Sequence, residues 1–401
     1  MNIAIIGGGA AGFFAAITCA EANPNCRVTI FERGKSVLEK VRVSGGGRCN
    51  ATHACFEPRE LVKNYPRGSR ELLGPFMQFG PEQTVAWFEQ RGVRLKTEAD
   101  GRMFPITDDS QTILDCLTRA AHKAGVRVLT STRVEKIERD PANPNGHWKI
   151  GSEPFDKIML ATGSSTTAWE WLRELGHTIV QPVPSLFTFN TKDIRLRDLA
   201  GVSVPMASLQ IPGTKLAADG PLLVTHWGLS GPAVLRISAW GARDLNKEWY
   251  KFPLEINFFP DKNIEGVLLS FQKTKIESPK KQVRANPHFG LPARLWQQLV
   301  EAAGIGPERR WADLTKSDLQ AVATQISAAQ FQITGKSTFK EEFVTAGGVS
   351  LKEVNFKTFE SRICPGLFFA GEVLDIDAIT GGFNFQAAWT GGWLAGQAMS
   401  R

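Results

Sequence analysis

The hydrophobic pattern is most informative at the start of the chain. An apolar run over Met1 to Ile6 predicts a buried strand, and the small apolar residues from Gly12 to Ala22 predict a helix. A second apolar run, Arg27 to Phe31, predicts another strand. Residues 7–12 are glycine and alanine, and Glu32 follows the second strand. The order of strand, glycine turn, helix, strand and acid predicts a βαβ unit that binds a dinucleotide.

Each glycine of this turn has a separate expected role. Gly7 lets the strand turn sharply, Gly9 removes a side chain that would hold a pyrophosphate away, and Gly12 lets the helix pack close to the strands. The free N–H groups at the helix start would bind the phosphates. Glu32 is placed to accept hydrogen bonds from an adenosine ribose, and an acid there disfavours NADP. The pattern favours FAD or NAD, and the alternative is an ordinary glycine-rich turn.

Mixed helices and strands are predicted up to residue 186. The segment Ser69 to Gly92 is expected to be helical, with Pro81 at the first turn of its second half, and Val93 to Phe104 predicts a hairpin. Ser110 is expected to cap a helix that ends at Gly125. Four strands are predicted after this helix: Val126–Ser131, Val134–Arg139, Trp148–Ile150 and Lys157–Ala161.

The pattern changes at Phe187. Short strands rich in Pro and Val now mix with helices without regular alternation, which predicts an α+β insertion. The predicted strands are Val202–Ile211, Leu222–His226 and Phe252–Phe259, and the predicted helices are Pro232–Asp244, Ile264–Lys273, Leu291–Ala303 and Ser317–Ala329.

The last part of the chain returns to the first pattern. Leu367 to Ala370 predicts an apolar strand, and Gly381-Gly382 precedes a small-residue helix that ends at Met399. A glycine pair before a helix offers free N–H groups, which would stabilise negative charge on a redox ring. Two such sites in one chain imply a long dinucleotide that spans both, so FAD is favoured over NAD.

A second glycine run, Gly45-Gly46-Gly47, lies between Arg42 and Arg48. Three successive glycines suit a backbone pressed against a flat or charged ligand, and the two arginines could pair with phosphates. A flexible surface loop is the alternative. Thr162-Gly163, after the strand that ends at Ala161, is another place where backbone could meet a cofactor.

Length and composition change the picture in three ways. At 401 residues, with 42% apolar residues, the chain is expected to form two domains with a large core. The uncharged run Met1 to Ala20 has no basic segment before it, and its glycines belong to the nucleotide fingerprint, so neither a signal peptide nor a membrane span is expected. The six cysteines are scattered without a CxxC pair, which favours reduced thiols in a cytoplasm over disulfides or a metal site.

The positive charge is concentrated in the insertion. The net charge is +7, residues 187–340 carry 20 Lys/Arg and 13 Asp/Glu, and the remainder carries 27 of each. This asymmetry suggests an anionic partner. Lys280, Lys281 and Arg284 belong to a basic segment that would contact RNA phosphates; a solvated charged loop is the alternative.

Several motifs together carry a resemblance to a known family. They are residues 7–12, SGGGRCN at 44–50, THWGLSGP at 225–232, TAGGV at 345–349 and AGEVLDIDAITGG at 370–382. By these motifs the chain is similar to the BaiN-like, aminoacetone-oxidase-like flavoproteins, to which the bacterial YhiN proteins belong. That family usually continues the motif RCN with a Thr-Asn pair, whereas Ala51-Thr52-His53 follow here, so His53 departs from the pattern.

The resemblance implies a fold and a cofactor site. It implies a discontinuous, glutathione-reductase-like FAD-binding domain formed by residues 1–186 and 341–401, with residues 187–340 as an α+β substrate or cap domain over the flavin. Glu32 would hold the adenosine ribose, and residues 44–50 would lie along the pyrophosphate and the ring. The residues expected to bind FAD are Gly7, Gly9, Ala11, Gly12, Glu32, Arg33, Arg42, Ser44, Gly45, Gly46, Arg48, Cys49, Asn50, Val134, Ala161, Thr162, Gly163, Gly371, Glu372, Asp375, Gly382, Phe383 and Asn384.

The resemblance leaves the substrate open, because the family's activities include amine oxidation, reduction of enone steroids, and reduction of uridine to dihydrouridine in ribosomal RNA. We weigh three hypotheses for this chain. The first hypothesis is an FAD-dependent reductase of an activated C=C, with NAD(P)H as a transient electron donor. Cys49 would be its proton donor, with His226 as the second candidate, although either could be an ordinary buried residue.

The other two hypotheses belong to different classes. An oxidase of a small amine could build an aromatic cage from some of the 11 tryptophans, but the basic insertion disfavours a cationic substrate. An RNA-binding protein with non-catalytic FAD is the third, against which the intact ring-facing motifs argue. The sequence carries no indication of oligomeric state.

Overall fold

The computed structural model describes residues 1–139, 147–337 and 344–401. The chain divides into two compact units, one formed by Met1–Pro184 with Lys340–Arg401 and the other by Ser185–Phe339. The domain boundaries expected from the sequence were 186/187 and 340/341, and the second of these lies outside the described residues. Each unit has its own sheet and helices.

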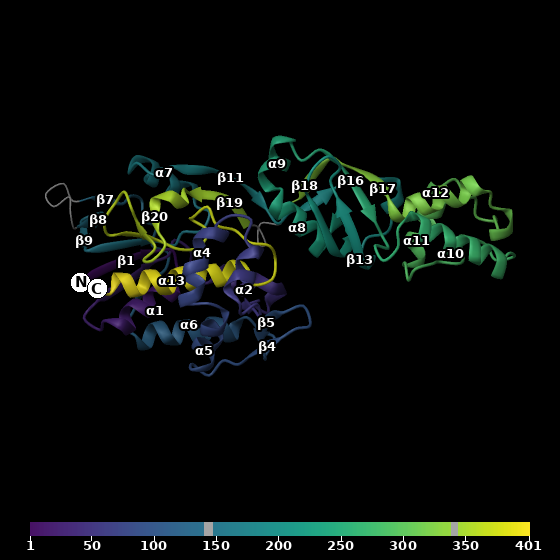
Figure 1. The fold of residues 1–401 in the computed structure, drawn as a ribbon. Helices are drawn as coiled ribbons and strands as arrows, with labels where there is room; N and C mark the ends of the chain where they lie inside the picture. Colours follow the sequence, from purple (N-terminus) through teal and green to yellow (C-terminus); the bar gives the residue numbers. More distant parts are fainter. Residues whose placement is uncertain (140–146, 338–343) are drawn as a thin grey trace. The chain divides into compact units, whose positions relative to one another are not determined.

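A seven-stranded sheet forms the centre of the first unit (Figure 1). Its order is β20-β21-β22-β10-β1-β2-β6, and the neighbours from β22 to β6 run parallel. Two short strands extend it antiparallel at the β22 edge. The strands are β1 (Asn2–Ile6), β2 (Arg27–Phe31), β6 (Arg127–Leu129), β10 (Lys157–Leu160), β20 (Val354–Asn355), β21 (Glu360–Ser361) and β22 (Leu367–Phe369).

Smaller sheets and helices complete this unit. Two three-stranded sheets are antiparallel, and β11 and β19 form a pair. The strands are β3 (Thr52–His53), β4 (Leu95–Thr97), β5 (Arg102–Pro105), β7 (Glu138–Arg139), β8 (Trp148–Ile150), β9 (Glu153–Phe155), β11 (Ile179–Ser185) and β19 (Val344–Val349). The helices are α1 (Ala10–Ala22), α2 (Glu39–Gly47), α3 (Pro58–Leu61), η1 (Val62–Asn64), α4 (Ser69–Gln78), α5 (Pro81–Glu89), α6 (Gln111–Lys123), α7 (Thr166–Glu174), η4 (Leu351–Glu353) and α13 (Phe383–Met399).

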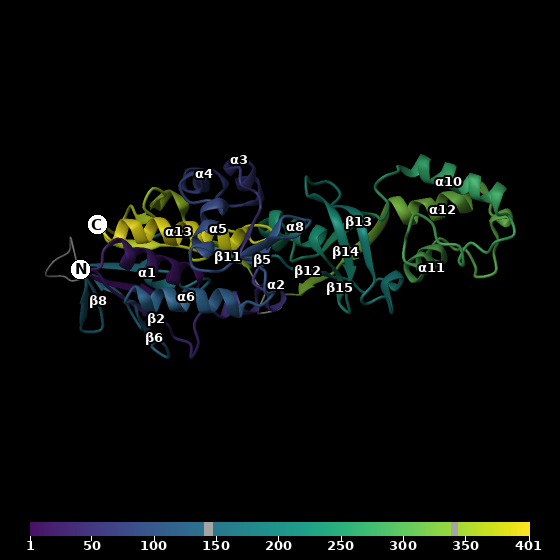
Figure 2. The same cartoon turned by 90° about the horizontal axis from the view of Figure 1, so that it is seen from below.

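The first and last long helices of the chain pack against each other. Helices α1 and α13 lie side by side in both views, and the two chain ends are close together (Figures 1 and 2). A Cβ atom at Gly392 would lie 2.7 Å from the carbonyl oxygen of Ala11, and one at Gly396 would lie 2.6 Å from that of Ala15. Any larger residue would push the helices apart, so glycine permits this close crossing.

The second unit is built on an antiparallel sheet in the order β17-β16-β13-β14-β15-β12-β18. Its helices do not alternate with the strands, as in α+β folds. The strands are β12 (Thr188–Asn190), β13 (Ser203–Gln210), β14 (Ala217–Val224), β15 (Gly228–Ser230), β16 (Phe252–Asn257), β17 (Ala329–Ile333) and β18 (Gly335–Ser337). The helices are η2 (Ile194–Leu196), α8 (Pro232–Trp240), α9 (Ala242–Lys247), α10 (Ile264–Glu277), α11 (Ala293–Ala302), η3 (Trp311–Asp313) and α12 (Lys316–Ser327).

The predicted βαβ unit and terminal helix are confirmed within a residue or two. Other predictions were wrong because their residues found different partners. Only Glu138–Arg139 of the expected strand Val134–Arg139 pairs as a strand. Ser110 occupies the N-cap position of α6, as expected, but its hydroxyl donates to the Arg42 carbonyl at 2.8 Å and makes no capping hydrogen bond.

Two expected helices are each divided at a glycine. The stretch Ser69–Gly92 forms α4 and α5, and Gly80 between them donates its N–H to the Gln83 side chain at 2.8 Å. Pro81 occupies the first turn of α5, as expected. The predicted helix Pro232–Asp244 is interrupted at Gly241, which separates α8 from α9.

Within the described ranges, all six cysteines carry free thiols. None of the helices in these ranges combines the length and apolar character needed to cross a bilayer.

A buried ion pair joins two distant segments of the first unit. The guanidinium of Arg67 donates from Nε and a terminal nitrogen to the two carboxylate oxygens of Asp377. The Asp377 side chain is 0% exposed and that of Arg67 is 10% exposed. The backbones of the same two residues also form an antiparallel bridge. The pair therefore anchors the segment between β22 and α13.

Replacing Arg67 should destabilise the protein strongly. Arg67→Ala leaves the buried Asp377 carboxylate without its guanidinium partner, so we expect the free energy of unfolding to fall by about 3–5 kcal/mol. The control is Lys63→Ala, because Lys63 pairs with Glu60 at the surface and should cost less than about 1 kcal/mol. Urea denaturation measures both, and equal effects would contradict the assigned role of the buried pair.

Candidate functional site

The segments predicted to bind FAD follow neighbouring parallel strands. Gly7 follows β1, Glu32 follows β2, Ala161 follows β10 and Gly371 comes shortly after β22. Because these strands are parallel and adjacent, their carboxyl ends meet at one edge of the sheet. Open α/β sheets bind their ligands at that edge. The fold therefore gathers these four segments where a cofactor would bind.

The glycine turn after β1 is shaped by two very close approaches. A Cβ atom at Gly7 would lie 2.3 Å from the carbonyl oxygen of Ala161, and one at Gly12 would lie 2.0 Å from the carbonyl oxygen of Gly7. Gly7 also has a φ of +110°, which disfavours other residues. Gly9 is the N-cap residue of α1, and no described atom lies within 4 Å of a Cβ placed there. The first N–H groups of α1 are therefore open to a phosphate.

Glu32 holds the loops around this turn. One carboxylate oxygen accepts the N–H of Gly8 at 2.9 Å, and the other accepts the N–H of Gly34 at 2.6 Å. Each carboxylate oxygen can accept more than one hydrogen bond, so these contacts leave capacity for a ribose hydroxyl. Arg33, the next residue in the expected set, is exposed.

The second glycine run has a left-handed backbone. The φ values of Gly45, Gly46 and Gly47 are +58°, +68° and +84°, and the first two interrupt the helical geometry of α2. A Cβ atom at Gly45 would lie 3.0 Å from both the Asn50 nitrogen and the Phe104 ring. Within the described residues, nothing lies within 4 Å of a Cβ at Gly46 or Gly47. The backbone of these two residues can therefore contact a flat ligand.

Asn50 joins this loop to the start of α13. With its amide oriented to suit both neighbours, Asn50 accepts the N–H of Gly382 at 3.0 Å and donates to the Thr52 carbonyl at 3.0 Å. The Thr52 hydroxyl donates to Gln386 of α13 at 2.6 Å. Tyr65 donates its hydroxyl to the carbonyl of Phe383 at 2.6 Å. The two motifs that were expected to face the flavin ring are thus in direct contact.

Asn384 and Asp375 have local contacts. The Asn384 side chain accepts the N–H of Ala378 at 3.0 Å and donates to the carbonyl of the same residue at 3.2 Å. Asp375 is buried, and its N–H donates to the Val349 carbonyl at 3.1 Å. Both residues therefore shape the segment before α13. Val134 is buried in the segment that precedes β7.

Glu372 connects three elements at the same edge. Its carboxylate pairs with Lys40 of α2 and accepts the N–H of Thr345 in β19 at 2.8 Å. A Cβ atom at Gly163 would lie 3.7 Å from a Glu372 oxygen. Sequence reasoning missed Lys40, because a single lysine before a glycine run carries no signal of its own. Ala11 also belongs to this group, since a Cβ at Gly371 would lie 3.3 Å from its methyl group.

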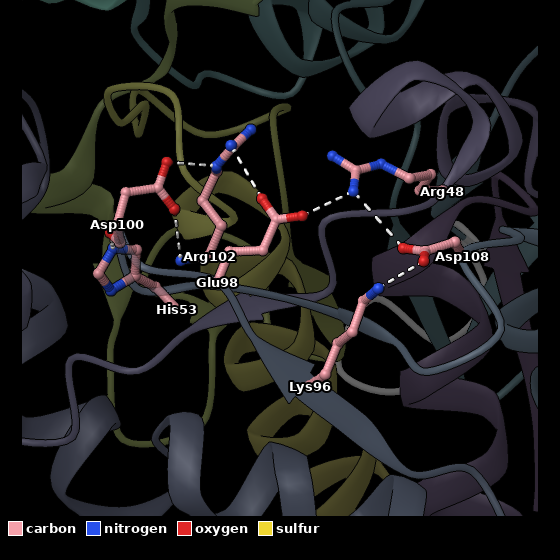
Figure 3. Close-up of polar contacts among 7 residues, drawn as sticks. All are labelled: Arg48, His53, Lys96, Glu98, Asp100, Arg102 and Asp108. Carbon is pink, nitrogen blue, oxygen red and sulfur yellow. Dashed lines mark hydrogen bonds and ion pairs between the residues drawn. The ribbon is translucent and has the colours of Figure 1, made fainter.

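The arginines beside the second glycine run are engaged by protein groups. Figure 3 shows the guanidinium of Arg48 between Glu98, at 2.7 Å, and Asp108, at 3.5 Å. It also lies 4.0 Å from the centre of the Phe104 ring, and its hydrogen bond to Glu98 raises its pKa. Arg42 donates to the Gln111 side chain at 2.8 Å. In this structure the two arginines hold the loop in place.

The two candidate proton donors lie in different units. Cys49 is 0% exposed with a φ of +61°, and burial raises the pKa of its thiol to about 12 against the opposing hydrogen bond with Ser44. The thiol therefore keeps its proton at neutral pH. His226 is exposed in the turn between β14 and β15 of the second unit. It is not among the residues that gather in the first unit.

Two buried hydroxyls fit a bound cofactor. The hydroxyl oxygens of Thr162 and Thr345 have no hydrogen-bond partner among the described residues. Buried polar atoms are nearly always paired, so unpaired ones at this edge indicate contacts with a ligand. Together with the open faces of Gly9, Gly46 and Gly47, they fit FAD. Thr345 was absent from the expected set, although it begins the TAGGV motif. The described residues contain no cluster of metal-binding side chains.

Comparison with known proteins identifies the family. A family model described as the HI0933-like protein Rossmann domain matches residues 1–398. The chain belongs to this family. It is 30% identical over 409 residues to a ribosomal RNA dihydrouridine synthase of Escherichia coli, covering 98% of this chain and 96% of the relative. It is also 28% identical to a 3-dehydro-bile acid delta(4,6)-reductase of Clostridium scindens, covering 99% and 98%.

A solved structure confirms the fold. The chain is similar to a 3-ketosteroid-delta4-(5alpha)-dehydrogenase from Rhodococcus jostii, with a TM-score of 0.53, 15% identity and coverage of 100% of this chain and 96% of that one. Together with membership of the HI0933-like family, this similarity confirms the predicted fold class. The protein is an FAD-dependent oxidoreductase with a Rossmann-like FAD-binding domain.

Substitutions at two glycines should separate folding from cofactor binding. Gly9→Ala adds a methyl group where no described atom lies nearby, so the protein should fold but hold FAD at least about tenfold more weakly, because the methyl group would face the phosphates of bound FAD. Gly12→Ala meets the Gly7 carbonyl and should lower the free energy of unfolding by at least about 2 kcal/mol. Flavin fluorescence titration and thermal denaturation measure the two effects. Undiminished FAD affinity in Gly9→Ala would contradict the site.

Proposed function

We propose that the protein uses NAD(P)H to reduce its FAD and then reduces an activated C=C bond, with uridine in ribosomal RNA as the substrate. The observation that carries the reaction class is the pair of relatives. One is named a reductase and the other a dihydrouridine synthase, and each spans nearly the whole chain. Forming dihydrouridine from uridine adds two hydrogens across a ring C=C, so both names describe reductions.

Two observations favour RNA over a small apolar substrate. A third relative, from Haemophilus influenzae, is also named a ribosomal RNA dihydrouridine synthase and is 28% identical over 412 residues. The excess of positive charge lies entirely in residues 187–340, and a polyanion is attracted to such a region. The proposal includes contacts with RNA phosphates through Lys280 and Lys281; Arg284, expected beside them from the sequence, lies 3.7 Å from Glu301.

The residues of the first unit would act together on the cofactor and the substrate. Bound FAD would supply the hydride to one carbon of the C=C. The start of α1 would hold the pyrophosphate, Glu32 the ribose, and the backbone of Gly46 and Gly47 the ring. Cys49 would donate the proton to the neighbouring carbon, which completes the addition of two hydrogens. The protein would act in the cytoplasm, where its thiols stay reduced.

Anaerobic reduction tests the electron donor. We expect NADH or NADPH to bleach the visible absorbance of the bound flavin, and uridine-containing ribosomal RNA to restore it with formation of dihydrouridine. Aminoacetone, a small amine, should leave the flavin oxidised. Bleaching by the amine without NAD(P)H would instead support an oxidase, and bleaching by neither would support a non-catalytic flavin. Mapping dihydrouridine in ribosomal RNA from cells that lack the protein locates the modified position.

Cys49→Ser should separate proton donation from cofactor binding. We expect normal FAD content and a kcat lowered by at least about 10²-fold, because the alcohol is a poorer proton donor. Since burial raises the thiol pKa to about 12, the native enzyme should show no alkaline loss of activity from this group between about pH 7 and 10. The control is Cys116→Ser, at another buried cysteine in α6. Full activity of the Cys49 variant would remove Cys49 from the mechanism.

A further inference from the structure

A basic pocket lies in the second unit, apart from the segments that fit FAD. Its volume is about 330 Å³, and it opens to solvent. It is lined by Lys280, Lys281, Gln282, Ala285, Asn286 and Arg310. These residues come from two segments, one after α10 and one just before η3.

Backbone pairing holds the two segments together. Gln282 and Arg310 form an antiparallel bridge. On either side of it, Val283 donates its N–H to the Arg309 carbonyl at 3.0 Å, and Trp311 donates its N–H to the Lys281 carbonyl at 3.1 Å. The cationic side chains therefore start from a backbone of defined geometry.

Buried residues of the second unit's core pack against this backbone. Val283 and the Trp296 indole are both 0% exposed, and the indole N–H donates to the Val283 carbonyl at 2.8 Å. Trp311, directly after Arg310, is also 0% exposed. Buried residues thus flank the exposed lysines and Arg310 on each segment. A pocket built in this way is preorganised for a ligand.

The three cations of the pocket are not neutralised by nearby carboxylates. Among the described residues, no ion pair involves Lys280, Lys281 or Arg310, and all three side chains are exposed. The two adjacent arginines differ in this respect. Arg284 lies 3.7 Å from Glu301, and Arg309 lies 2.9 Å from Asp318.

Other charged and titratable groups near the pocket fit the same picture. His288 has its pKa lowered by burial and, secondly, by the positive charge of Lys281. Its ring nitrogen lies 3.4 Å from the Asn286 amide nitrogen. Two carboxylates stand close by. Gln282 donates its amide to Glu308 at 2.7 Å, and the Asp313 carboxylate accepts the backbone N–H of Arg310 at 3.1 Å. The balance of charge at the pocket is still positive, with Glu308 and Asp313 opposing the three cations.

We propose that this pocket binds a phosphate group of the RNA backbone. The Arg310 guanidinium presents paired donors that match two phosphate oxygens, and Lys280 and Lys281 add point charges. Arg310 takes the place that the sequence suggested for Arg284, which is turned to Glu301. The choice of RNA rests on the proposed function, whereas the anion site rests on the pocket itself.

The test neutralises the pocket in the full-length, FAD-bound protein. The variant combines Lys280→Gln, Lys281→Gln and Arg310→Gln, and a fluorescent oligouridylate of about 12 nucleotides is the probe. We expect affinity at about 100 mM salt to fall on the order of tenfold, and the slope of log K against log salt to become shallower by about 2. The matched control combines Lys215→Gln, Lys251→Gln and Lys316→Gln, three exposed lysines of the same unit, and should change neither value as much.

A second variant tests whether removing a negative charge near the pocket raises RNA affinity. Glu308→Gln removes a carboxylate beside the pocket, so RNA affinity should rise by about threefold. Equal losses in the pocket variant and its control would show a diffuse charge effect and overturn the proposal, as would unchanged RNA affinity. Inorganic pyrophosphate is titrated into the same proteins as a second probe. If the pocket variant loses pyrophosphate binding while its RNA affinity stays intact, the pocket binds a small anion and the RNA assignment is overturned.

The same proteins distinguish the two proposals. If the pocket variant binds RNA weakly while the native protein forms no dihydrouridine on any RNA, the proposed reaction fails and the phosphate pocket stands. If the native protein forms dihydrouridine and the pocket variant matches it in RNA affinity and KM, the pocket proposal fails and the reaction stands.

Discussion

The structure of the first unit depends on close contact between backbones at the carboxyl edge of its parallel sheet. The carbonyl oxygen of Ala161 occupies the space beside Gly7, and the carbonyl of Gly7 in turn occupies the space beside Gly12. Residues with side chains at these positions would separate β10, β1 and α1 by the width of a methyl group or more. The start of α1 would then move relative to Glu32, whose carboxylate holds Gly8. The phosphate-binding geometry is thus a consequence of backbone packing within the sheet.

The end of the chain completes the same edge through contacts of a different kind. Close glycine crossings set α13 against α1. The Asn50 side chain accepts the N–H of Gly382 and the Thr52 hydroxyl donates to Gln386, and these bonds fix the start of α13 against the second glycine run. The Glu372 carboxylate adds a link from the β22 loop to α2 and β19. These contacts hold the loops together through protein groups alone. A long dinucleotide that touches both halves would therefore bind to a site already assembled by the protein.

The sequence predicted those parts of the candidate site that depend on local backbone requirements. Gly7, Gly12 and the terminal glycine pair could be found because a sharp turn or a close crossing tolerates little else, and the apolar strands beside them have a simple periodicity. Side-chain partners distant in sequence left no such signature. Arg48 was expected to face phosphates, but its guanidinium pairs with Glu98 and Asp108. These partners lie about 50 and 60 residues further along the chain, and the sequence around residue 48 does not indicate them. Lys40 and Arg310 were missed because the residues they meet lie far away in the sequence. Ser110 makes no capping bond because its hydroxyl donates to the Arg42 carbonyl.

Charge is distributed between the units in a way that separates chemistry from substrate affinity. The first unit carries almost balanced charge, and Arg48 beside the second glycine run is paired with Glu98 and Asp108. Under the proposed function, a base brought to FAD would meet little excess charge, so hydride transfer to it would depend little on the salt concentration. The three pocket cations Lys280, Lys281 and Arg310 stand in the second unit, where under the proposed function they would attract a polyanion through its phosphates and would carry no information about the base that reacts. Affinity set in this way would depend on salt and on the length of the nucleic acid, while the choice of nucleotide would be left to the edge built around Gly46, Asn50 and Gly382.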